Sequence, residues 1–377
     1  MNILYIEPYY GESHKQWIDS YSKNSKHNIE ILSLSDKWWK SRMHVGSVTL
    51  AEEYMKYDKK VDLLLCSDML NLPVFHSICS RKIKNIPVAM YFHENQISYP
   101  WSPDDQDTRL ERDFHYYFIN YTSALVSSCN FFNSQYHLDS FIKGLRKYLK
   151  KMPDFNDYSS IDLISSKSSV LYLGTDLLCF NRHKQEYSNK SPVILWNHRW
   201  EYDKNPEDFF SVLGRLKRDG LDFKVVVLGR KYSRYPEVFD KAREELSDSI
   251  IHFGYCDEYS DYCKYLWMSD FLPVTSIQEY FGISVIEAVF CNTIPILPNR
   301  LSYPELYNIE EFPDLFYKDR DDLYRNLKRK INDFYKSGRP KINLSEYILH
   351  YDWKYMASEY DSLFKGIELP SDTTINI

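Results

Sequence analysis

The chain has 377 residues and a formal net charge of −6 at pH 7, and that length predicts two or three domains of about 150 residues each. A composition of 44% hydrophobic and 27% charged residues predicts folded domains, and only 11 glycines exclude collagen-like and glycine-linker sequences. The acidic balance argues against a general nucleic-acid coating protein, because such proteins bind through net positive charge.

The first half of the chain alternates short apolar runs with longer segments of helical periodicity. The strands that this pattern predicts are Asn2–Ile6, Ile29–Leu34, Val61–Cys66, Val88–Tyr91, Ala124–Ser127 and Val170–Tyr172. The helices predicted between them include His14–Tyr21, Asp107–Tyr121 and Gln135–Leu149. The polar stretch Lys150–Lys167 is predicted to be a loop or an insertion.

The second half repeats this alternation and adds a final helical segment. Its predicted strands are Val193–Trp196, Lys224–Leu228, Ile250–Phe253, Phe271–Val274 and Ile294–Leu297. Its predicted helices are Pro206–Lys217, Pro236–Leu246, Tyr259–Met268, Gly282–Phe290, Pro304–Tyr307 and Tyr351–Phe364.

This alternation of strands and helices predicts parallel sheets with helices on both faces. Two such series in one chain predict an α/β protein of two doubly wound, Rossmann-like domains that face a cleft. The polar stretch Asn181–Pro192 lacks apolar periodicity and separates the series, which gives domains of residues 1–185 and 186–348. Ligands bind at the carboxyl ends of parallel strands in such folds, so we expect the functional residues in the loops that follow strands.

The N-terminus and the cysteine usage indicate the compartment. Asn2–Ile6 follows a strand pattern with no basic region before a long apolar one, unlike a signal peptide. No apolar run approaches the roughly 18 residues of a membrane span, so we expect no stable membrane insertion. The seven cysteines have no CxxC spacing, which favours reduced thiols in a cytoplasmic protein and argues against a zinc site.

The loop after the first predicted strand is a candidate part of a binding site. Gly11 is expected to take a positive φ angle and to bring the backbone close to a ligand. Ser13 is expected to cap the following helix, and His14 to lie at the helix start facing the cleft. A plain turn with a capping serine is the alternative interpretation.

A second loop of the first domain follows the strand Val88–Tyr91 directly. It places the polar residues His93, Glu94 and Asn95 behind an apolar run, which favours a site over a core segment. His93 is suited to act as an acid, a base or a hydrogen-bond donor near neutral pH. A solvated loop is the alternative.

The second domain opens with two cations, Arg199 and Lys204, in the loop that follows its first strand. A diphosphate leaving group gains negative charge as its bond breaks, and two cations at this position would stabilise that charge. Arginine supplies a planar fork of donors and lysine a point charge. Two surface cations are the alternative.

The most specific pattern is Ser276–Ala288, which follows the predicted strand Phe271–Val274. Gly282 opens a helix and leaves N–H groups of Phe281, Gly282 and Ile283 for an anionic phosphate. The carboxylates Glu279 and Glu287 lie on either side of this junction. One is placed to meet a transferred group and the other to accept hydrogen bonds from ribose hydroxyls, although two surface glutamates are the alternative.

The helix Gln135–Leu149 has a polar start and a basic end. Asn133 and Ser134 are typical of a helix N-cap, whereas Lys143–Lys151 carries five basic residues and no acid. That end either complements the helix dipole or contacts a phosphate backbone. Residues 1–185 have 22 basic and 21 acidic residues and residues 186–377 have 25 and 32, so the acidic excess lies in the second half.

The second domain as a whole resembles retaining glycosyltransferase family 4, which has the GT-B fold. Ser276–Ala288 resembles that family's E-x7-E signature, the Arg199 loop resembles its donor-phosphate loop, and Tyr172–Asp176 resembles its P-x-G-V-D segment. Trp353–Phe364 resembles the helix that crosses back onto the first domain, which implies a third segment of residues 349–377.

The first half narrows this resemblance. IEPYYGESHKQW, Asp36–His44 and Tyr91–Trp101 resemble the N-terminal domain of tRNA-queuosine mannosyltransferases, also named glycosyltransferase-like domain-containing proteins. Gly-Glu-Ser-His stands at residues 11–14 where that family has Gly-Gly-Ser-His. The resemblance implies transfer of mannose from GDP-mannose to the cyclopentenediol of queuosine in a tRNA anticodon.

The resemblance also implies roles for the candidate residues. Arg199 and Lys204 hold the donor diphosphate, Glu287 binds the nucleotide ribose, Glu279 contacts the sugar, and His93 contacts the sugar or the leaving phosphate. The acceptor-binding candidates in the first domain are Gly11, Ser13, His14, Glu94 and Asn95. No metal cofactor is expected, and no protein nucleophile is assigned.

Three functions remain open from the sequence. A tRNA-queuosine transferase would take a tRNA partner, on which Trp38, Trp39 and Tyr91 are candidates for base stacking. A family 4 enzyme that acts on a lipid-linked or surface glycan would need a membrane-docking amphipathic helix, for which Gln135–Lys151 is the candidate. A non-enzymatic nucleotide-sugar or RNA-binding module is the third.

Overall fold

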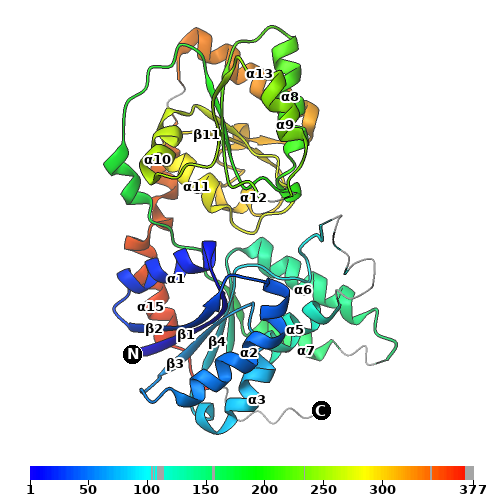
Figure 1. Ribbon diagram of the computed structural model, residues 1–377, viewed down its shortest axis with the longest axis vertical. Helices are drawn as coiled ribbons and strands as arrows, with labels where there is room; N and C mark the ends of the chain where they lie inside the picture. The colour runs from blue at the N-terminus through cyan, green and yellow to red at the C-terminus, as the bar shows by residue number, and fades with distance from the viewer. Residues whose placement is uncertain are drawn as a thin grey trace. The chain divides into compact units, whose positions relative to one another are not determined.

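The computed structural model describes residues 1–102, 105, 107, 114–154, 158–232, 234–339 and 342–369. The chain forms two compact units, which are described separately (Figure 1). Unit 1 consists of Met1–Thr175 together with Trp353–Ile377, and unit 2 consists of Asp176–Asp352. The domain ranges 1–185, 186–348 and 349–377 stay a prediction from the sequence.

Unit 1 is built on a six-stranded sheet in the order β2-β1-β3-β4-β5-β6, and every strand pair is parallel. The strands are β1 (Asn2–Tyr10), β2 (Asn28–Ser35), β3 (Leu63–Ser67), β4 (Val88–Phe92), β5 (Cys129–Phe132) and β6 (Ser168–Val170). The helices are α1 (Glu12–Asn24), α2 (Trp39–Lys56), α3 (Leu72–Ile83), α5 (Phe114–Val126), α6 (Gln135–Leu149), α7 (Ser159–Ser166) and α15 (Trp353–Lys365).

Unit 2 is built on a second parallel sheet, in the order β12-β11-β10-β7-β8-β9. The strands are β7 (Val193–Asn197), β8 (Lys224–Leu228), β9 (Ile250–Gly254), β10 (Phe271–Pro273), β11 (Ile294–Pro298) and β12 (Phe316–Tyr317). The α-helices are α8 (Pro206–Arg218), α9 (Val238–Glu245), α10 (Tyr259–Met268), α11 (Ile283–Phe290), α12 (Tyr303–Leu306), α13 (Arg320–Ser337) and α14 (Leu344–Tyr347). The 3-10 turns are η1 (Leu177–His183), η2 (Tyr202–Lys204), η3 (Pro313–Leu315) and η4 (Ile348–Tyr351).

The strand order fixes where each unit can bind a ligand. In unit 1 the order reverses between β1 and β3, and in unit 2 it reverses between β7 and β10. At such a switch point the two adjacent loops leave on opposite faces of the sheet, so a crevice opens at the carboxyl ends of the strands. The loops after β1 and β3, and those after β7 and β10, are therefore the positions to search.

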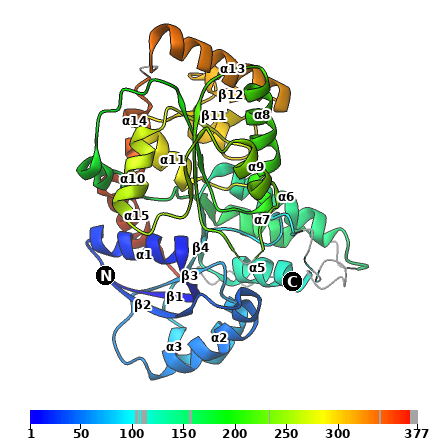
Figure 2. The same cartoon turned by 45° about the horizontal axis from the view of Figure 1, so that its top comes forward.

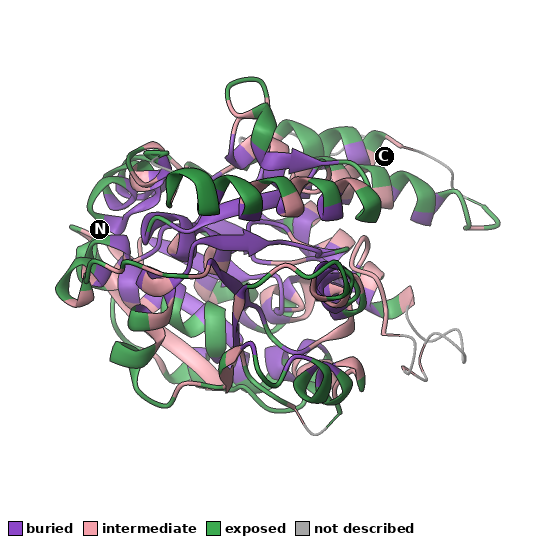
Figure 3. Cartoon of the chain, turned by 90° about the horizontal axis from the view of Figure 1, so that it is seen from above, coloured by how far each residue is buried: buried purple, intermediate pink, exposed green. Residues whose placement is uncertain are grey.

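The sheets form because their central strands are apolar on both faces. All residues of β3, β4 and β7 are buried, as is usual for parallel strands covered by helices on both sides. Figure 3 shows these buried strands inside and the exposed outer faces of the helices around them. In α13 the buried residues Leu323, Leu327, Ile331 and Phe334 follow helical spacing, which fixes the face that packs.

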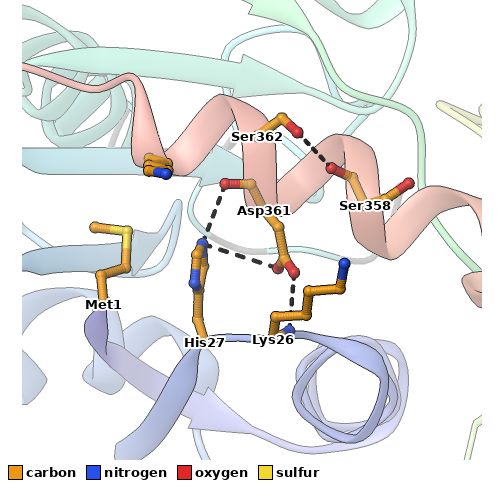
Figure 4. Close-up of a pocket in the computed structure, with 7 residues that line it drawn as sticks. Met1, Lys26, His27, Ser358, Asp361 and Ser362 are labelled. Carbon is orange, nitrogen blue, oxygen red and sulfur yellow. Dashed lines mark hydrogen bonds and ion pairs between the residues drawn. The ribbon is translucent and has the colours of Figure 1, made fainter.

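The C-terminal helix α15 completes unit 1, beside α1 (Figures 1 and 2). Asp361 of α15 accepts hydrogen bonds from the Tyr21 hydroxyl at 2.9 Å, the Ser25 hydroxyl at 2.5 Å and the Lys26 N–H at 2.8 Å. The hollow beside these residues, shown in Figure 4, is lined in part by Met1 at the amino end of β1. It therefore lies away from the carboxyl ends of the strands.

Most predicted elements are confirmed, but the predicted strand Ala124–Ser127 is wrong. Ala124 and Leu125 belong to the last turn of α5, and the strand is the next run, Cys129–Phe132. An apolar run of four residues suits a buried helix end and a buried strand equally well, so periodicity did not separate them. The prediction of a loop over Lys150–Lys167 missed α7, and part of the predicted helix Asp107–Tyr121, residues 108–113, lies outside the described residues.

Candidate active site

Two loops of unit 2 meet at the switch point of its sheet, one after β7 and one after β10. The N–H of Ile277 donates to the Asp203 carbonyl at 2.8 Å, and the Thr275 hydroxyl donates to the Lys204 carbonyl at 2.8 Å. These two hydrogen bonds hold the loops side by side. Residues that the sequence singled out on separate loops, Lys204 and Glu279, are therefore neighbours in the fold.

Lys204 is buried where these two loops meet. Its Nζ lies 3.0 Å from Glu279 Oε2 and 3.1 Å from Asp203 Oδ2, and it donates to the Gln278 carbonyl at 3.2 Å. Burial lowers the pKa of Lys204, but the two carboxylates outweigh it and raise that pKa above its ordinary value. The ammonium therefore stays charged, and removing it would leave the buried Asp203 and the half-buried Glu279 without this partner.

Arg199 lies on the same loop in a different setting. Its side chain is 43% exposed, and its Nη2 lies 3.3 Å from Glu201 Oε2. Its positive charge lowers the pKa of Lys204, so the two cationic side chains are close enough to interact electrostatically. The structure thus brings Lys204 and Glu279 into direct contact and leaves Arg199 reachable from solvent.

The start of α11 offers backbone donors beside this pair. Gly282 is its N-cap with φ of 89°, a left-handed conformation that favours glycine. A Cβ at this position would lie 3.4 Å from Glu279 Cγ and from Tyr303 Cε1. No described side chain caps the helix, and the Val285 N–H already donates to the Gly282 carbonyl at 3.0 Å, so the N–H groups of Ile283 and Ser284 are the ones placed to meet an anion.

The residues flanking Gly282 differ in what they present. The Phe281 side chain is buried and packs edge-on against Tyr351 at 5.2 Å between ring centroids. Its side chain is therefore packed and does not contact a ligand. Ile283 is half-buried as the first residue of α11, and Ser284 Oγ lies 3.3 Å from Nδ1 of the buried His198.

Glu287 lies deeper in the same helix and in another environment than Glu279. The Tyr262 hydroxyl of α10 donates to its Oε2 at 2.5 Å, and Asn197 Nδ2 donates to that hydroxyl at 3.1 Å. Burial raises the pKa of Glu287 to about 7, the Tyr262 hydrogen bond opposes this rise, and Asp176 adds to it. Glu279 is thus ion-paired with lysine, and the half-buried Glu287 is hydrogen-bonded to tyrosine.

In unit 1 the loop after β1 corrects two sequence expectations. Gly11 has φ of −161°, which is extended backbone, so a positive φ is not what requires glycine there. A Cβ on Gly11 would lie 2.2 Å from the Asp36 Cβ, so close approach to Asp36 requires it. Ser13 does not cap the helix, because α1 begins at Glu12 with Gly11 as its N-cap, and Ser13 is exposed.

Position 12 is where this chain departs from the Gly-Gly-Ser-His pattern. Glu12 has φ of 46°, in the left-handed region. A glycine takes that conformation without steric cost, whereas a residue with a Cβ is strained in it. The departure therefore falls on a backbone position that suits glycine.

His14 and His93 meet at the carboxyl ends of β1 and β4. Their rings stack with centroids 4.1 Å apart. Nδ1 of His14 lies 2.9 Å from Oε2 of Glu7, a residue of β1 that the sequence did not single out. Burial lowers the pKa of His14, but Glu7 outweighs it and raises that pKa to about 9. Burial and the neighbouring His14 hold the pKa of His93 well below its ordinary value.

The rest of the β4 loop is held by local hydrogen bonds, and a neighbouring loop holds His93. The Asn95 Oδ1 accepts from the N–H of Ser98 at 2.8 Å and so closes a turn, and Glu94 accepts from Gln96 Nε2 at 3.0 Å. Oδ1 of Asp68, after β3, accepts from the His93 N–H at 2.8 Å. Asp68 is a second residue that the sequence did not reveal.

The aromatic candidates divide into one exposed and two packed residues. Trp38 is 82% exposed and has φ of 58° at the start of α2. Trp39 packs against Tyr116 at 5.3 Å between ring centroids, and Tyr91 is fully buried. Trp38 is therefore the one of the three that is open to stacking.

Three further findings bear on cofactors and surroundings. No three His, Cys, Asp or Glu side chains of the described residues are grouped so as to hold a metal ion. None of the helices in the described ranges has both the length and the apolar character needed to cross a membrane. All seven cysteines are free thiols.

Comparison with solved structures defines the class of protein. Sucrose-phosphate synthase from Thermosynechococcus elongatus superposes with a TM-score of 0.70 and 13% identity over 97% of this chain and 98% of that one. HepE of Anabaena, solved with UDP, gives a TM-score of 0.67 and 14% identity over 97% and 100%. A glycosyltransferase from Rickettsia africae gives 0.64 and 16% over 97% and 98%. The chain thus has the predicted GT-B glycosyltransferase fold.

Comparison of sequences then names the family. Residues 2–175 match the family model of the tRNA-queuosine alpha-mannosyltransferase N-terminal domain, and residues 180–349 match that of glycosyl transferases group 1. The tRNA-queuosine alpha-mannosyltransferase of Drosophila melanogaster is 33% identical over 357 residues, which span 86% of this chain and 91% of that protein. The chain belongs to the tRNA-queuosine alpha-mannosyltransferase family. It is a hexosyltransferase that uses a nucleotide-sugar donor, as predicted.

Proposed function

We propose that this enzyme transfers mannose from GDP-mannose to the cyclopentenediol of queuosine in a tRNA anticodon, and that it is a retaining family 4 transferase. The observation that carries the proposal is the 33% identity to the Drosophila tRNA-queuosine alpha-mannosyltransferase over 86% of the chain. A tRNA acceptor also agrees with the cytoplasmic location that the sequence predicts.

The donor is assigned to the switch point of unit 2. The diphosphate meets Arg199, Lys204 and the first-turn N–H groups of α11, which together match an anion that gains charge during the reaction. Glu287 accepts hydrogen bonds from the ribose hydroxyls, and Glu279 contacts the sugar. The ion pair of Lys204 with Glu279 at 3.0 Å supports this assignment, because it links the phosphate site to the sugar site.

The chemistry follows from these roles. The acceptor hydroxyl oxygen forms a bond to the anomeric carbon of the sugar, while the bond from that carbon to the diphosphate oxygen breaks. The hydroxyl proton passes to the departing diphosphate oxygen. The cations of the Arg199 loop stabilise the departing charge, and neither a metal ion nor a protein nucleophile enters the sequence of events.

The acceptor is assigned to unit 1. His93 and His14 lie together at the carboxyl ends of its strands, and Trp38 offers an exposed ring on which a base of a single-stranded loop can stack. The basic residues of Lys143–Lys151 are exposed, as a contact to an RNA backbone requires, and they are Lys143, Arg146, Lys147, Lys150 and Lys151.

A lipid-linked glycan acceptor gains no support from α6. That proposal needs an amphipathic helix whose apolar face is unpacked. The apolar residues Phe141, Leu145 and Leu149 of α6 are buried in the core of unit 1. The tRNA acceptor is therefore the function that we propose.

The test uses two tRNAs that differ only in queuosine or guanosine at the anticodon position. Each is incubated with the protein and with GDP-mannose, UDP-glucose or UDP-galactose, and its nucleosides are examined by mass spectrometry. A hexose gain on queuosine with GDP-mannose alone is expected. A gain with another donor would overturn the choice of sugar, and no gain with any donor would overturn the acceptor.

A further inference from the structure

Glu7 is a buried carboxylate that none of the proposed steps uses. It lies on β1 beside the switch point of unit 1, and it is completely buried. Oε1 accepts from the Tyr9 N–H at 2.8 Å and the Ser67 hydroxyl at 2.8 Å. Oε2 accepts from the Tyr5 hydroxyl at 2.6 Å and from Nδ1 of His14 at 2.9 Å.

Four hydrogen-bond partners on two oxygens match the acceptor capacity of an ionised carboxylate. A protonated carboxyl would turn one acceptor oxygen into a donor and would oppose one of the four hydrogen bonds. These contacts suit a carboxylate anion inside the fold, where an uncompensated charge is costly. Of these four partners the His14 ring is the one that can carry a positive charge, so it is the group able to supply the compensating charge.

The Glu7 contact fixes the tautomer of His14 and favours its charged form. Nδ1 carries the proton that is donated to Glu7, and a positive charge on the ring, which compensates the buried carboxylate, places a second proton on Nε2. Burial alone lowers the pKa of His14, while Glu7, then Asp68 after β3 and Glu94 after β4, raise it to about 9. The groups that face the ring are thus three acids and one histidine, His93.

His93 has the opposite character although it stacks on His14. The two rings lie 4.1 Å apart at an interplanar angle of 29°, and Nε2 of His93 is buried without a hydrogen-bond partner. Burial and the charge of His14 keep the pKa of His93 well below its ordinary value. Two imidazoles in such contact do not both carry a positive charge, and the hydrogen bond that His14 donates to Glu7 favours the charge on His14.

We propose that Glu7 is a positioning residue that holds His14 doubly protonated, so that the Nε2–H of His14 serves as a cationic donor to a phosphate oxygen of a substrate. This inference rests on the proposed function for the substrate. Anions are also favoured here by the first turn of α1, whose N-cap Gly11 has no side-chain cap. Both the nucleotide sugar and an RNA supply phosphate oxygens.

The direct test is a pH titration of the ¹⁵N-labelled histidines by NMR, with His14→Gln to assign the signal. His14 in the free enzyme is expected to be doubly protonated at pH 7.5 and to lose a proton near pH 9. In Glu7→Gln the same signal should titrate at or below about pH 6.5, the ordinary value. A neutral His14 at pH 7.5 in the unaltered enzyme would overturn the proposal without any variant having to fold.

The kinetic test separates positioning from mere folding. Between pH 6.5 and 8.5 the turnover of Glu7→Gln, divided by that of the unaltered enzyme at the same pH, should fall about fortyfold, for His14 pKa values of about 6.5 and about 9. Titrations that both proteins share, such as that of Glu287, cancel in this ratio. Glu30→Gln, a matched change at a glutamate on β2 that pairs with exposed Lys59, is the control and should follow the unaltered enzyme. Parallel profiles for all three proteins would contradict the role of Glu7.

The source of the phosphate is decided by two binding measurements on Glu7→Gln at pH 8.5. A weaker affinity for GDP alone assigns His14 to the nucleotide, and a weaker affinity for the tRNA alone assigns it to the RNA backbone. Unchanged affinity for both would overturn the phosphate contact. The NMR titration needs no substrate, so it stands or fails separately from hexose transfer to queuosine.

Discussion

Replacing Glu287 by glutamine should make unit 2 respond differently to pH. In the folded enzyme burial raises the pKa of Glu287 from 4.5 to about 7. Between these values the folded state keeps the proton and the unfolded state has lost it, so the stability of the folded state falls as the pH rises. At about 1.4 kcal/mol for each pKa unit, the full loss is about 3 kcal/mol, of which about 2.5 kcal/mol falls between pH 5 and 8.5.

Glutamine has no proton to lose and still accepts from Tyr262, so Glu287→Gln lacks this decline. The free energy of unfolding of the variant minus that of the unaltered enzyme should rise by about 2.5 kcal/mol from pH 5 to 8.5, or about 5–10 °C in melting temperature for a unit of this size. The assay is thermal and urea unfolding across that range, with Glu244→Gln, an exposed glutamate of α9, as control. A difference that does not change with pH would refute the account of Glu287.

Three other changes test the site and its loops. Lys204→Ala should lower kcat/KM by about 10²–10³, the usual cost of removing one charge-stabilising donor, and unchanged turnover in a donor hydrolysis assay would contradict the donor site. Glu12→Gly should raise the melting temperature, because it relieves about 1 kcal/mol of left-handed strain at φ of 46°, and a lower one would contradict the strain. Trp38→Ala should weaken tRNA binding by about 1–3 kcal/mol without changing the melting temperature, because its ring is 82% exposed, and unchanged binding would exclude base stacking.

The sequence predicted most of the fold because parallel strands and amphipathic helices leave clear periodicity. Three predicted elements, Gln135–Leu149, Lys224–Leu228 and Tyr259–Met268, have the bounds that the structure shows. The prediction failed at Ala124–Ser127, where the apolar end of α5 and the strand β5 are separated by only Ser127 and Ser128. Local pattern carries no information on which of two adjacent apolar runs joins the sheet.

The candidate site was predicted only where its residues form a local motif. Lys204 and Glu279 were found because each lies in a loop after a strand, and the fold joins them at 3.0 Å. Tyr262 was missed because it lies on a helix with no motif and meets Glu287 only through tertiary packing. Glu7 left one signal, a carboxylate directly after an apolar strand run, which a search for charged residues in buried strands would have found.

The measurement that tests the central claim most directly is hexose transfer from GDP-mannose to a matched pair of tRNAs. The enzyme should add one hexose to the tRNA that carries queuosine and none to the tRNA that carries guanosine at the same position. Lys204→Ala should abolish most of that gain. Equal transfer to both tRNAs, or transfer to neither, would contradict the account.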